Sequence, residues 1–299
     1  MYEFQDGKFV KHYTTDNSAL ESPFNPPSKD YTIVTSVKYD AAGNLWALNS
    51  LISNSIKCLS KSDGKWTTYK HSELSGTNSY DLEKAFISKT NGKMWFVNNN
   101  YNNTILYSYD YANDVLTKYG PSIINQDGTS LGANYIFSPV EDREGNVWVG
   151  TNNGLALFNP QSEKFITFKH IEGNENSLLS DQILDIKQMK DGTLWICTNM
   201  GGVSILNLRE NTFISPEKIT FSNITVTNDN HGLSGPNARS IIQDSFGNIW
   251  IGNYRGGVDF ISYAQPLFNT IAYTIEKQGK INNKQVWGLW ADNHQIWLG

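Results

Sequence analysis

The stretch Gly145–Pro160, GNVWVGTNNGLALFNP, is the clearest copy of a unit that recurs along the whole chain. It begins with a Gly-Asn turn and continues as a short apolar strand centred on Trp148. A glycine-containing loop follows, and a second apolar strand ends at Phe158. Short apolar runs bounded by Gly and Asn are typical of strands joined by tight turns.

The same local context surrounds six tryptophans, which we call the anchor tryptophans. They lie 49, 53, 47, 55 and 47 residues apart. The anchors are Trp46, Trp95, Trp148, Trp195, Trp250 and Trp297. A repeat of about 50 residues with about four short strands per copy is typical of a propeller blade. No helical periodicity of useful length separates the strands, which argues against alternating strand and helix units.

The repeats predict an all-β fold, a β-propeller of four-stranded antiparallel blades. One four-stranded sheet cannot bury both of its faces, whereas stacked blades cover each face with a neighbour and hide most strand edges. Each anchor tryptophan is expected to pack in the seam between adjacent blades, where its large area contributes most. We therefore interpret the anchors as structural residues and not as sugar-stacking platforms.

The repeats add up to about six blade-equivalents. Residues 1–265 are expected to form blades, as a half-blade at 1–31 followed by five repeats. Residues 266–299 would hold the last outer strand and the start of a further blade or of a second propeller. The two half-units could pair into one composite blade of a six-bladed ring. Alternatively, the chain is a fragment or a close relative of a seven-bladed ring, because both ends fall within the repeat pattern.

The composition limits the class of protein. The 299 residues are 39% hydrophobic and 13% aromatic, which predicts a sizeable core and argues against disorder. The net charge of −5, without a basic run, argues against a nucleic-acid partner. No apolar run is long enough for a transmembrane helix, and no signal peptide is visible. Cys58 and Cys197 lie in apparent strands and are expected to be buried free thiols.

The units follow approximately the pattern D-x-x-G-N-[LVI]-W-[IV]-G-T-x-x-G-[LV]-x-x-[FL]-N, best in Asp142–Pro160, Asp191–Leu208 and Asp244–Ser262. This pattern resembles the two-component-regulator propeller repeat. The resemblance covers nearly the whole chain, although the copies at Trp46 and Trp95 lack the Gly-Thr pair after the tryptophan.

The resemblance implies the periplasmic sensor region of a hybrid two-component system, a class typical of gut Bacteroidetes. In that family, two seven-bladed propellers precede a β-sandwich, a membrane helix, a histidine kinase and a DNA-binding regulator. The sensor detects oligosaccharides. The implied partners are thus an oligosaccharide, a second propeller and the membrane-linked kinase of the same inner-membrane protein, with a homodimer as a further partner. Pro266–Asn269 resembles the junction between two such propellers.

Candidate ligand-binding residues lie where the connections between second and third strands share a face with the connections between blades. Amide, aromatic and guanidinium side chains suit hydroxyl-rich or anionic sugars, because they offer paired hydrogen bonds and stacking faces. The candidates are Asn134, Tyr135, Asn152, Asn153, Asp181, Asn199, Met200, Asn237, Arg239, Tyr254 and Arg255. Asn152 and Asn153 are expected to be the candidates that the fold constrains least.

Two other functions are alternatives to ligand sensing. A protein-interaction scaffold is one, because propellers often present flat surfaces. A propeller polysaccharide lyase is the other, and it would need convergent His, Tyr or Arg groups with perturbed pKa values. The acidic residues lie mostly in turns at equivalent positions, and the five histidines have no metal-site spacing. We therefore predict no catalytic residue, no metal and no cofactor.

Overall fold

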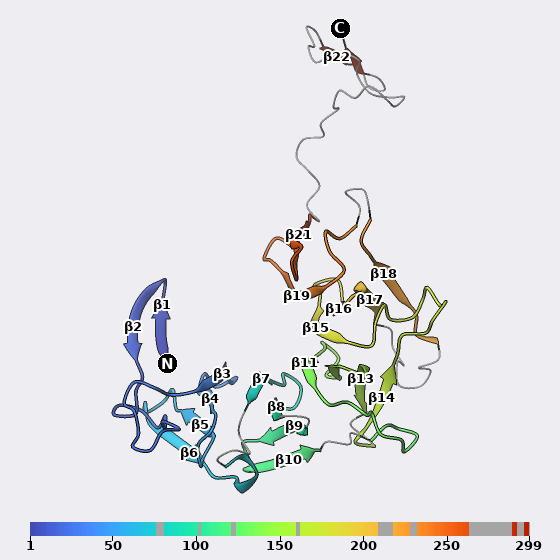
Figure 1. Cartoon of the computed structure of the whole chain (residues 1–299). Helices are drawn as coiled ribbons and strands as arrows, with labels where there is room; N and C mark the ends of the chain where they lie inside the picture. The colour runs from blue at the N-terminus through green and yellow to red at the C-terminus, as the bar shows by residue number, and fades with distance from the viewer. Residues whose placement is uncertain are drawn as a thin grey trace. The chain divides into compact units, whose positions relative to one another are not determined.

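The computed structural model describes residues 1–75, 81–100, 103–120, 124–159, 162–208, 218–227, 232–262, 289–291 and 296–298. Within these residues the strands form four four-stranded sheets, one three-stranded sheet and two two-stranded sheets. Strands that follow one another in the chain pair antiparallel within each sheet, as Figure 1 shows. The predicted all-β fold of antiparallel propeller blades is confirmed.

The N-terminal residues form a hairpin of β1 (Tyr2–Gln5) and β2 (Lys8–His12). Blade 1 contains β3 (Val34–Tyr39), β4 (Leu45–Asn49), β5 (Ile56–Leu59) and β6 (Trp66–Tyr69). The 3-10 turn η1 (Ser72–Leu74) follows. Blade 2 contains β7 (Leu82–Ile87), β8 (Met94–Asn100), β9 (Asn103–Asp110) and β10 (Val115–Tyr119).

Three further blades complete the first compact unit of the chain. Blade 3 contains β11 (Ile136–Glu141), β12 (Val147–Thr151), β13 (Gly154–Asn159) and β14 (Lys164–Phe168). Blade 4 contains β15 (Ile183–Gln188), β16 (Thr193–Thr198), β17 (Gly202–Asn207) and β18 (Phe221–Ile224). Blade 5 contains β19 (Ala238–Gln243), β20 (Ile249–Asn253) and β21 (Gly257–Ile261).

The chain divides into two compact units, Met1–Ile261 and Ser262–Gly299. The second unit contains the paired strands β22 (Leu289–Ala291) and β23 (Ile296–Leu298), and the anchor Trp297 lies in β23. The expected boundary at 265–266 and the expected outer strand after it lie outside the described residues.

The anchor tryptophans fill the seams between consecutive blades. Trp46, Trp95, Trp148 and Trp195 are between 0% and 4% exposed. Each belongs to a core cluster that also contains strands of the following blade. The ring of Trp46, for example, lies 4.6 Å from that of Tyr111 in blade 2. The predicted position in the seams is confirmed for these four anchors.

Trp250 differs from these four anchors, because its side chain is 39% exposed. Its ring packs 4.5 Å from that of Phe260 within the same blade. Within the described part of residues 1–261, no further blade covers the face that carries Trp250. Within these residues the Trp250 ring therefore packs against its own sheet.

A hydrogen bond from the turn before the strand holds several anchors in place. The indole N–H groups of Trp46, Trp148 and Trp250 donate to the aspartate six residues earlier, at 2.9, 2.8 and 3.1 Å. Blade 4 has methionine at the aspartate position, and Trp195 donates instead to the hydroxyl of Thr193 at 3.0 Å. The turn aspartates thus orient the anchors as well as forming the turns.

The first strand of each blade carries an irregularity in its pairing with the second strand. In blades 1, 3, 4 and 5 the second residue of this strand has no partner, and the register shifts across it. The shift lies between Ile136 and Ser138 in blade 3 and between Ala238 and Ser240 in blade 5. A β-bulge of this kind redirects the side chain of the extra residue. In blade 5 that residue is Arg239.

Candidate functional site

The turn between the second and third strands of a blade lies beside the segment that enters its first strand. Three equivalent backbone bonds join the two: Asn152 N to Tyr135 O, Asn199 N to Gln182 O, and Tyr254 N to Asn237 O, at 2.9–3.1 Å. The eleven candidate residues occupy this end of blades 3, 4 and 5. We call it the loop face.

Asn152 closes its own blade at the loop face. Its side-chain Oδ1 accepts hydrogen bonds from the backbone N–H groups of Asn134 and Tyr135, at 3.0 and 3.1 Å. The carbonyl of Asn134 in turn accepts a bond from the Thr104 hydroxyl of blade 2 at 2.6 Å. These bonds hold the backbone of the segment that carries the Tyr135 side chain.

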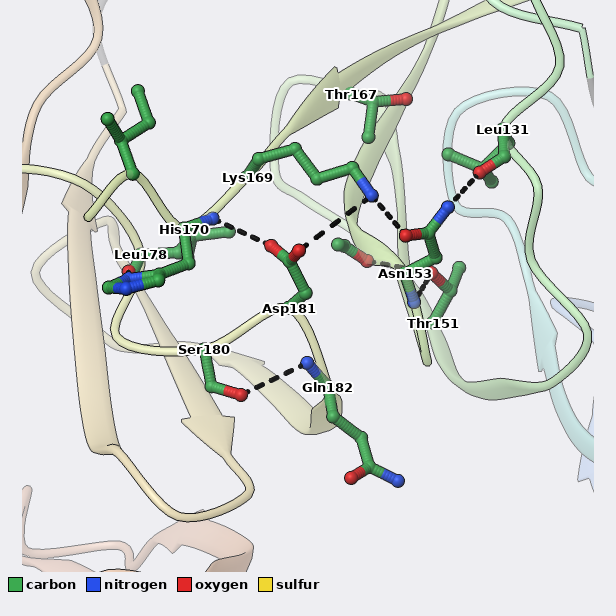
Figure 2. Close-up of polar contacts among 12 residues, drawn as sticks. Leu131, Thr151, Asn153, Thr167, Lys169, His170, Leu178, Ser180, Asp181 and Gln182 are labelled. Carbon is green, nitrogen blue, oxygen red and sulfur yellow. Dashed lines mark hydrogen bonds and ion pairs between the residues drawn. The ribbon is translucent and has the colours of Figure 1, made fainter.

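Asn153 belongs to a polar network that connects blade 3 with the segment entering blade 4 (Figure 2). Its Nδ2 donates to Leu131 O at 2.5 Å, and its Oδ1 accepts a bond from Lys169 Nζ. Lys169 Nζ also lies 3.9 Å from Asp181 Oδ2. The two asparagines are therefore more firmly held than the sequence indicated.

Asp181 ties the same segment to the end of blade 3. Its Oδ1 accepts a bond from the backbone N–H of His170 at 2.7 Å, and its carbonyl accepts one from Gly154 N at 2.6 Å. Partial burial lowers the pKa of Lys169, while the charge of Asp181 acts in the other direction. The hydrogen bond to Leu178 O raises the pKa of His170.

Lys169 and His170 were not among the candidates taken from the sequence. They follow the outer strand β14, whereas the candidates lie in the turns and at the entry to each first strand. The position directly after an outer strand is the signal that could have found them. Figure 2 shows Lys169 pointing between Asn153 and Asp181.

Tyr135 reaches from blade 3 toward blade 2. Its ring packs 4.6 Å from that of Phe137, and its hydroxyl lies 3.4 Å from Glu83 Oε1. Burial, together with the charges of Glu83 and Asp81, raises the pKa of the Tyr135 phenol. The residue as a whole remains 36% exposed.

Blades 4 and 5 meet at Asn237. Its Oδ1 accepts a bond from Met200 N at 2.8 Å, and its carbonyl accepts the bond from Tyr254 N. Within blade 4, Asn199 Nδ2 donates to Gln182 Oε1 at 2.5 Å. Met200 and Tyr254 are 70% and 50% exposed, so two largely apolar side chains face solvent beside Asn237.

Arg239 and Arg255 surround the ring of Tyr254. Each guanidinium carbon lies 5.2 Å from the centroid of that ring, within the range of a cation–π contact. The loop face thus offers amides, aromatic rings and guanidinium groups on adjoining blades. Among the residues described, no cluster of three His, Cys, Asp or Glu side chains could hold a metal ion.

The fold and this face define a β-propeller built from repeats. The model of the two-component regulator propeller matches residues 130–153 and 232–255. Each match extends from the segment before the first strand through the turn after the second, and so includes loop-face residues. The chain carries two-component-regulator propeller repeats, as its sequence pattern indicated.

Among solved structures, the chain is similar to the extracellular domain of a hybrid two-component system from B. thetaiotaomicron. The identity is 29%, the alignment covers 89% of this chain and 31% of that one, and the TM-score is 0.54. PorZ, a surface component of the type-IX secretion system of Porphyromonas gingivalis, is 19% identical over 87% of this chain and 35% of that one. Its TM-score of 0.68 supports the fold alone.

A curated relative, histidine kinase P4 of Formosa agariphila, is 32% identical over 90 residues. The match covers 29% of this chain and 7% of that protein. No helix in the described part of the chain has the length and hydropathy needed to span a bilayer.

Proposed function

We propose that the chain is a ligand-sensing propeller segment of a hybrid two-component sensor, and that its ligand is an oligosaccharide bound at the loop face. The observation that carries this proposal is the arrangement of exposed apolar side chains and amides on three consecutive blades. Tyr135, Met200 and Tyr254 present apolar surface, and the surrounding amides are fixed by hydrogen bonds. Sugar sites combine apolar faces with a few precisely placed polar groups.

The parent protein in this proposal lies in the inner membrane, with the propeller in the periplasm. The similarity to an extracellular domain of a hybrid two-component system supports this placement. The further partners are a second propeller and a kinase of the same protein, and a second copy of the chain. Binding at the loop face would shift the equilibrium between two arrangements of these partners. A sensor domain can transmit a signal in this way without catalysing a reaction.

A glycan array followed by calorimetric titration tests the proposal. The chain is expected to bind at least one oligosaccharide, and Tyr254→Ala is expected to weaken that binding at least about tenfold, or about 1.4 kcal/mol. Phe246→Ala is the matched control. Its ring is 84% exposed but lies in the turn between β19 and β20, at the other end of the blade.

The alternatives give different results. Absence of binding to every glycan, together with capture of a defined protein partner, would favour the interaction scaffold. Release of unsaturated sugars from a polysaccharide would favour the lyase. Binding that Phe246→Ala weakens as much as Tyr254→Ala does would place the ligand away from the loop face.

A further inference from the structure

A cationic cluster lies at the loop face of blade 5. Arg239 and Arg255 each place their guanidinium carbon 5.2 Å from the centroid of the Tyr254 ring. The two guanidinium carbons therefore lie no farther apart than twice that distance. We call these three residues the arginine–tyrosine cluster.

The two arginines have no compensating acid in the described part of the chain. Every ion pair between described residues involves a lysine or a histidine, and none involves Arg239 or Arg255. Asp259 in the neighbouring strand forms no ion pair with either arginine, and its oxygens accept bonds from Ser234 N and from Asn253 Nδ2. Two like charges beside one ring, with no ion-pair partner among the described residues, form a favourable site for an anion.

Neither arginine takes part in the regular pairing of the sheet. Arg239 is the extra residue of the bulge between Ala238 and Ser240. Arg255 has a φ of 61°, in the left-handed region that side chains larger than glycine rarely adopt. Unusual backbone angles of this kind concentrate at ligand sites, where the surrounding structure maintains them.

The cluster is joined to an apolar surface on blade 4. Asn237 accepts bonds from both Met200 N and Tyr254 N, and so holds the two turns against each other. Met200 also has a left-handed φ, of 64°, and its side chain is 70% exposed. A ligand at the cluster can thus place an anionic group on the arginines and an apolar face on Met200.

We propose that the arginine–tyrosine cluster binds the carboxylate or sulfate group of a saccharide, so that the ligand of the loop face is an acidic oligosaccharide. This inference rests on the proposed function and narrows its class of ligand. A guanidinium group presents parallel N–H donors that match two oxygens of a carboxylate or a sulfate. A neutral sugar would leave both charges uncompensated.

Calorimetric titration of the chain with three probes tests the inference. The probes are tetragalacturonate, a sulfated galactotetraose and neutral galactotetraose, each measured at about 20 mM and about 300 mM NaCl. At least one acidic probe is expected to bind more tightly than the neutral probe. The higher salt concentration is expected to lower the affinity for that acidic probe. The acidic probe that binds identifies the anionic group as carboxylate or sulfate.

Three variants locate the anionic group. Arg239→Gln and Arg255→Gln are each expected to lower the affinity for the acidic probe at least about tenfold, because each change removes charged donors. Lys65→Gln is the control, since Lys65 is 81% exposed in the turn between β5 and β6, at the other end of a blade. Thermal unfolding midpoints close to that of the parent chain show that the variants are folded.

Three results would overturn the inference. Equal affinity for neutral and acidic probes, with both arginine variants unchanged, overturns it while oligosaccharide sensing stands. Inorganic sulfate is titrated in the same way, and an affinity equal to that of the sulfated probe shows that no saccharide is recognised at the cluster. Absence of binding to all three probes counts against the cluster, whereas the glycan array decides on oligosaccharide sensing.

Discussion

Trp148 and Asp142 form a buried pair in blade 3. The indole N–H donates to Asp142 Oδ2 at 2.8 Å, and the two residues are 0% and 4% exposed. The carboxylate also accepts bonds from the backbone and side chain of Asn146. One side chain thus joins the turn before β12 to the seam that Trp148 fills.

Trp148→Phe is expected to destabilise the chain by about 1–3 kcal/mol more than Trp95→Phe does. Both changes remove the same ring volume from a seam. Only Trp148 loses a hydrogen bond, because the indole N–H of Trp95 is buried without a partner. Urea unfolding of the two variants gives the difference. Equal destabilisation would mean that the bond to Asp142 contributes nothing net.

The turn aspartates predict opposite dependences on pH. At Asp40, burial acts to raise the pKa, but bonds from Trp46 and Asn44 outweigh it and lower the pKa below 3.8. The stability from Asp40 is therefore present above its unfolded pKa and is lost as pH falls through the folded value. At Asp142, burial is the largest influence and raises the pKa, so its contribution is greatest at low pH and is lost as pH rises.

Urea unfolding between about pH 3 and pH 7 checks these signs with Asp40→Asn and Asp142→Asn. The stability of the parent chain relative to Asp40→Asn is expected to fall as pH decreases. Relative to Asp142→Asn it is expected to rise. Parallel curves for the two variants would contradict the opposite pKa shifts of the two carboxyl groups.

The sequence predicted the blade pattern because that pattern depends on local signals. The Gly-Asn turns and the short apolar runs around Trp148 define β12 and β13 without knowledge of their partners. The exposure of Trp250 could not be predicted in this way. Its burial depends on which sheet covers its face, and that is not encoded in the repeat itself.

The placement of the candidate residues at one end of the blades could be predicted, but their contacts could not. The turns and entry segments lie together at the loop face, because antiparallel pairing brings them to the same end of each blade. The contacts of individual side chains depend on longer distances along the chain. Asn153 meets Leu131 and Lys169, and Asn237 meets Met200, through contacts that no local pattern specifies.

The two cysteines are expected to be unreactive in the folded chain. Cys58 and Cys197 are free and buried, and burial raises the pKa of the Cys58 thiol to about 11 and that of Cys197 further. The thiolate is the reactive species, so modification at pH 8 should be at least about a hundredfold slower than in the unfolded chain. A colorimetric thiol reagent measures both rates, and Cys58→Ser assigns the remaining signal to Cys197. Rapid modification of either thiol under native conditions would show that its strand opens.

Gly154 illustrates how the loop face depends on the sheet beneath it. Its φ is 116°, and a Cβ atom there would lie 2.5 Å from Phe168 O in the backbone of β14. Gly192 also has a positive φ, of 90°, but a Cβ atom added there would meet nothing within 4 Å beyond its chain neighbours. Gly154→Ala must therefore displace the backbone of β14 at Phe168. Gly192→Ala strains only the backbone angles of residue 192 itself.

Gly192→Ala is accordingly expected to cost about 1 kcal/mol, the usual penalty of the left-handed region. Gly154→Ala is expected to cost clearly more, and to weaken oligosaccharide binding, because Asn153 precedes it directly and Asp181 accepts its N–H. Urea unfolding and calorimetric titration of both variants provide the comparison. Equal destabilisation by Gly154→Ala and Gly192→Ala would contradict this prediction. It would mean that the close contact of β13 with β14 at Phe168 does not determine the position of Asn153.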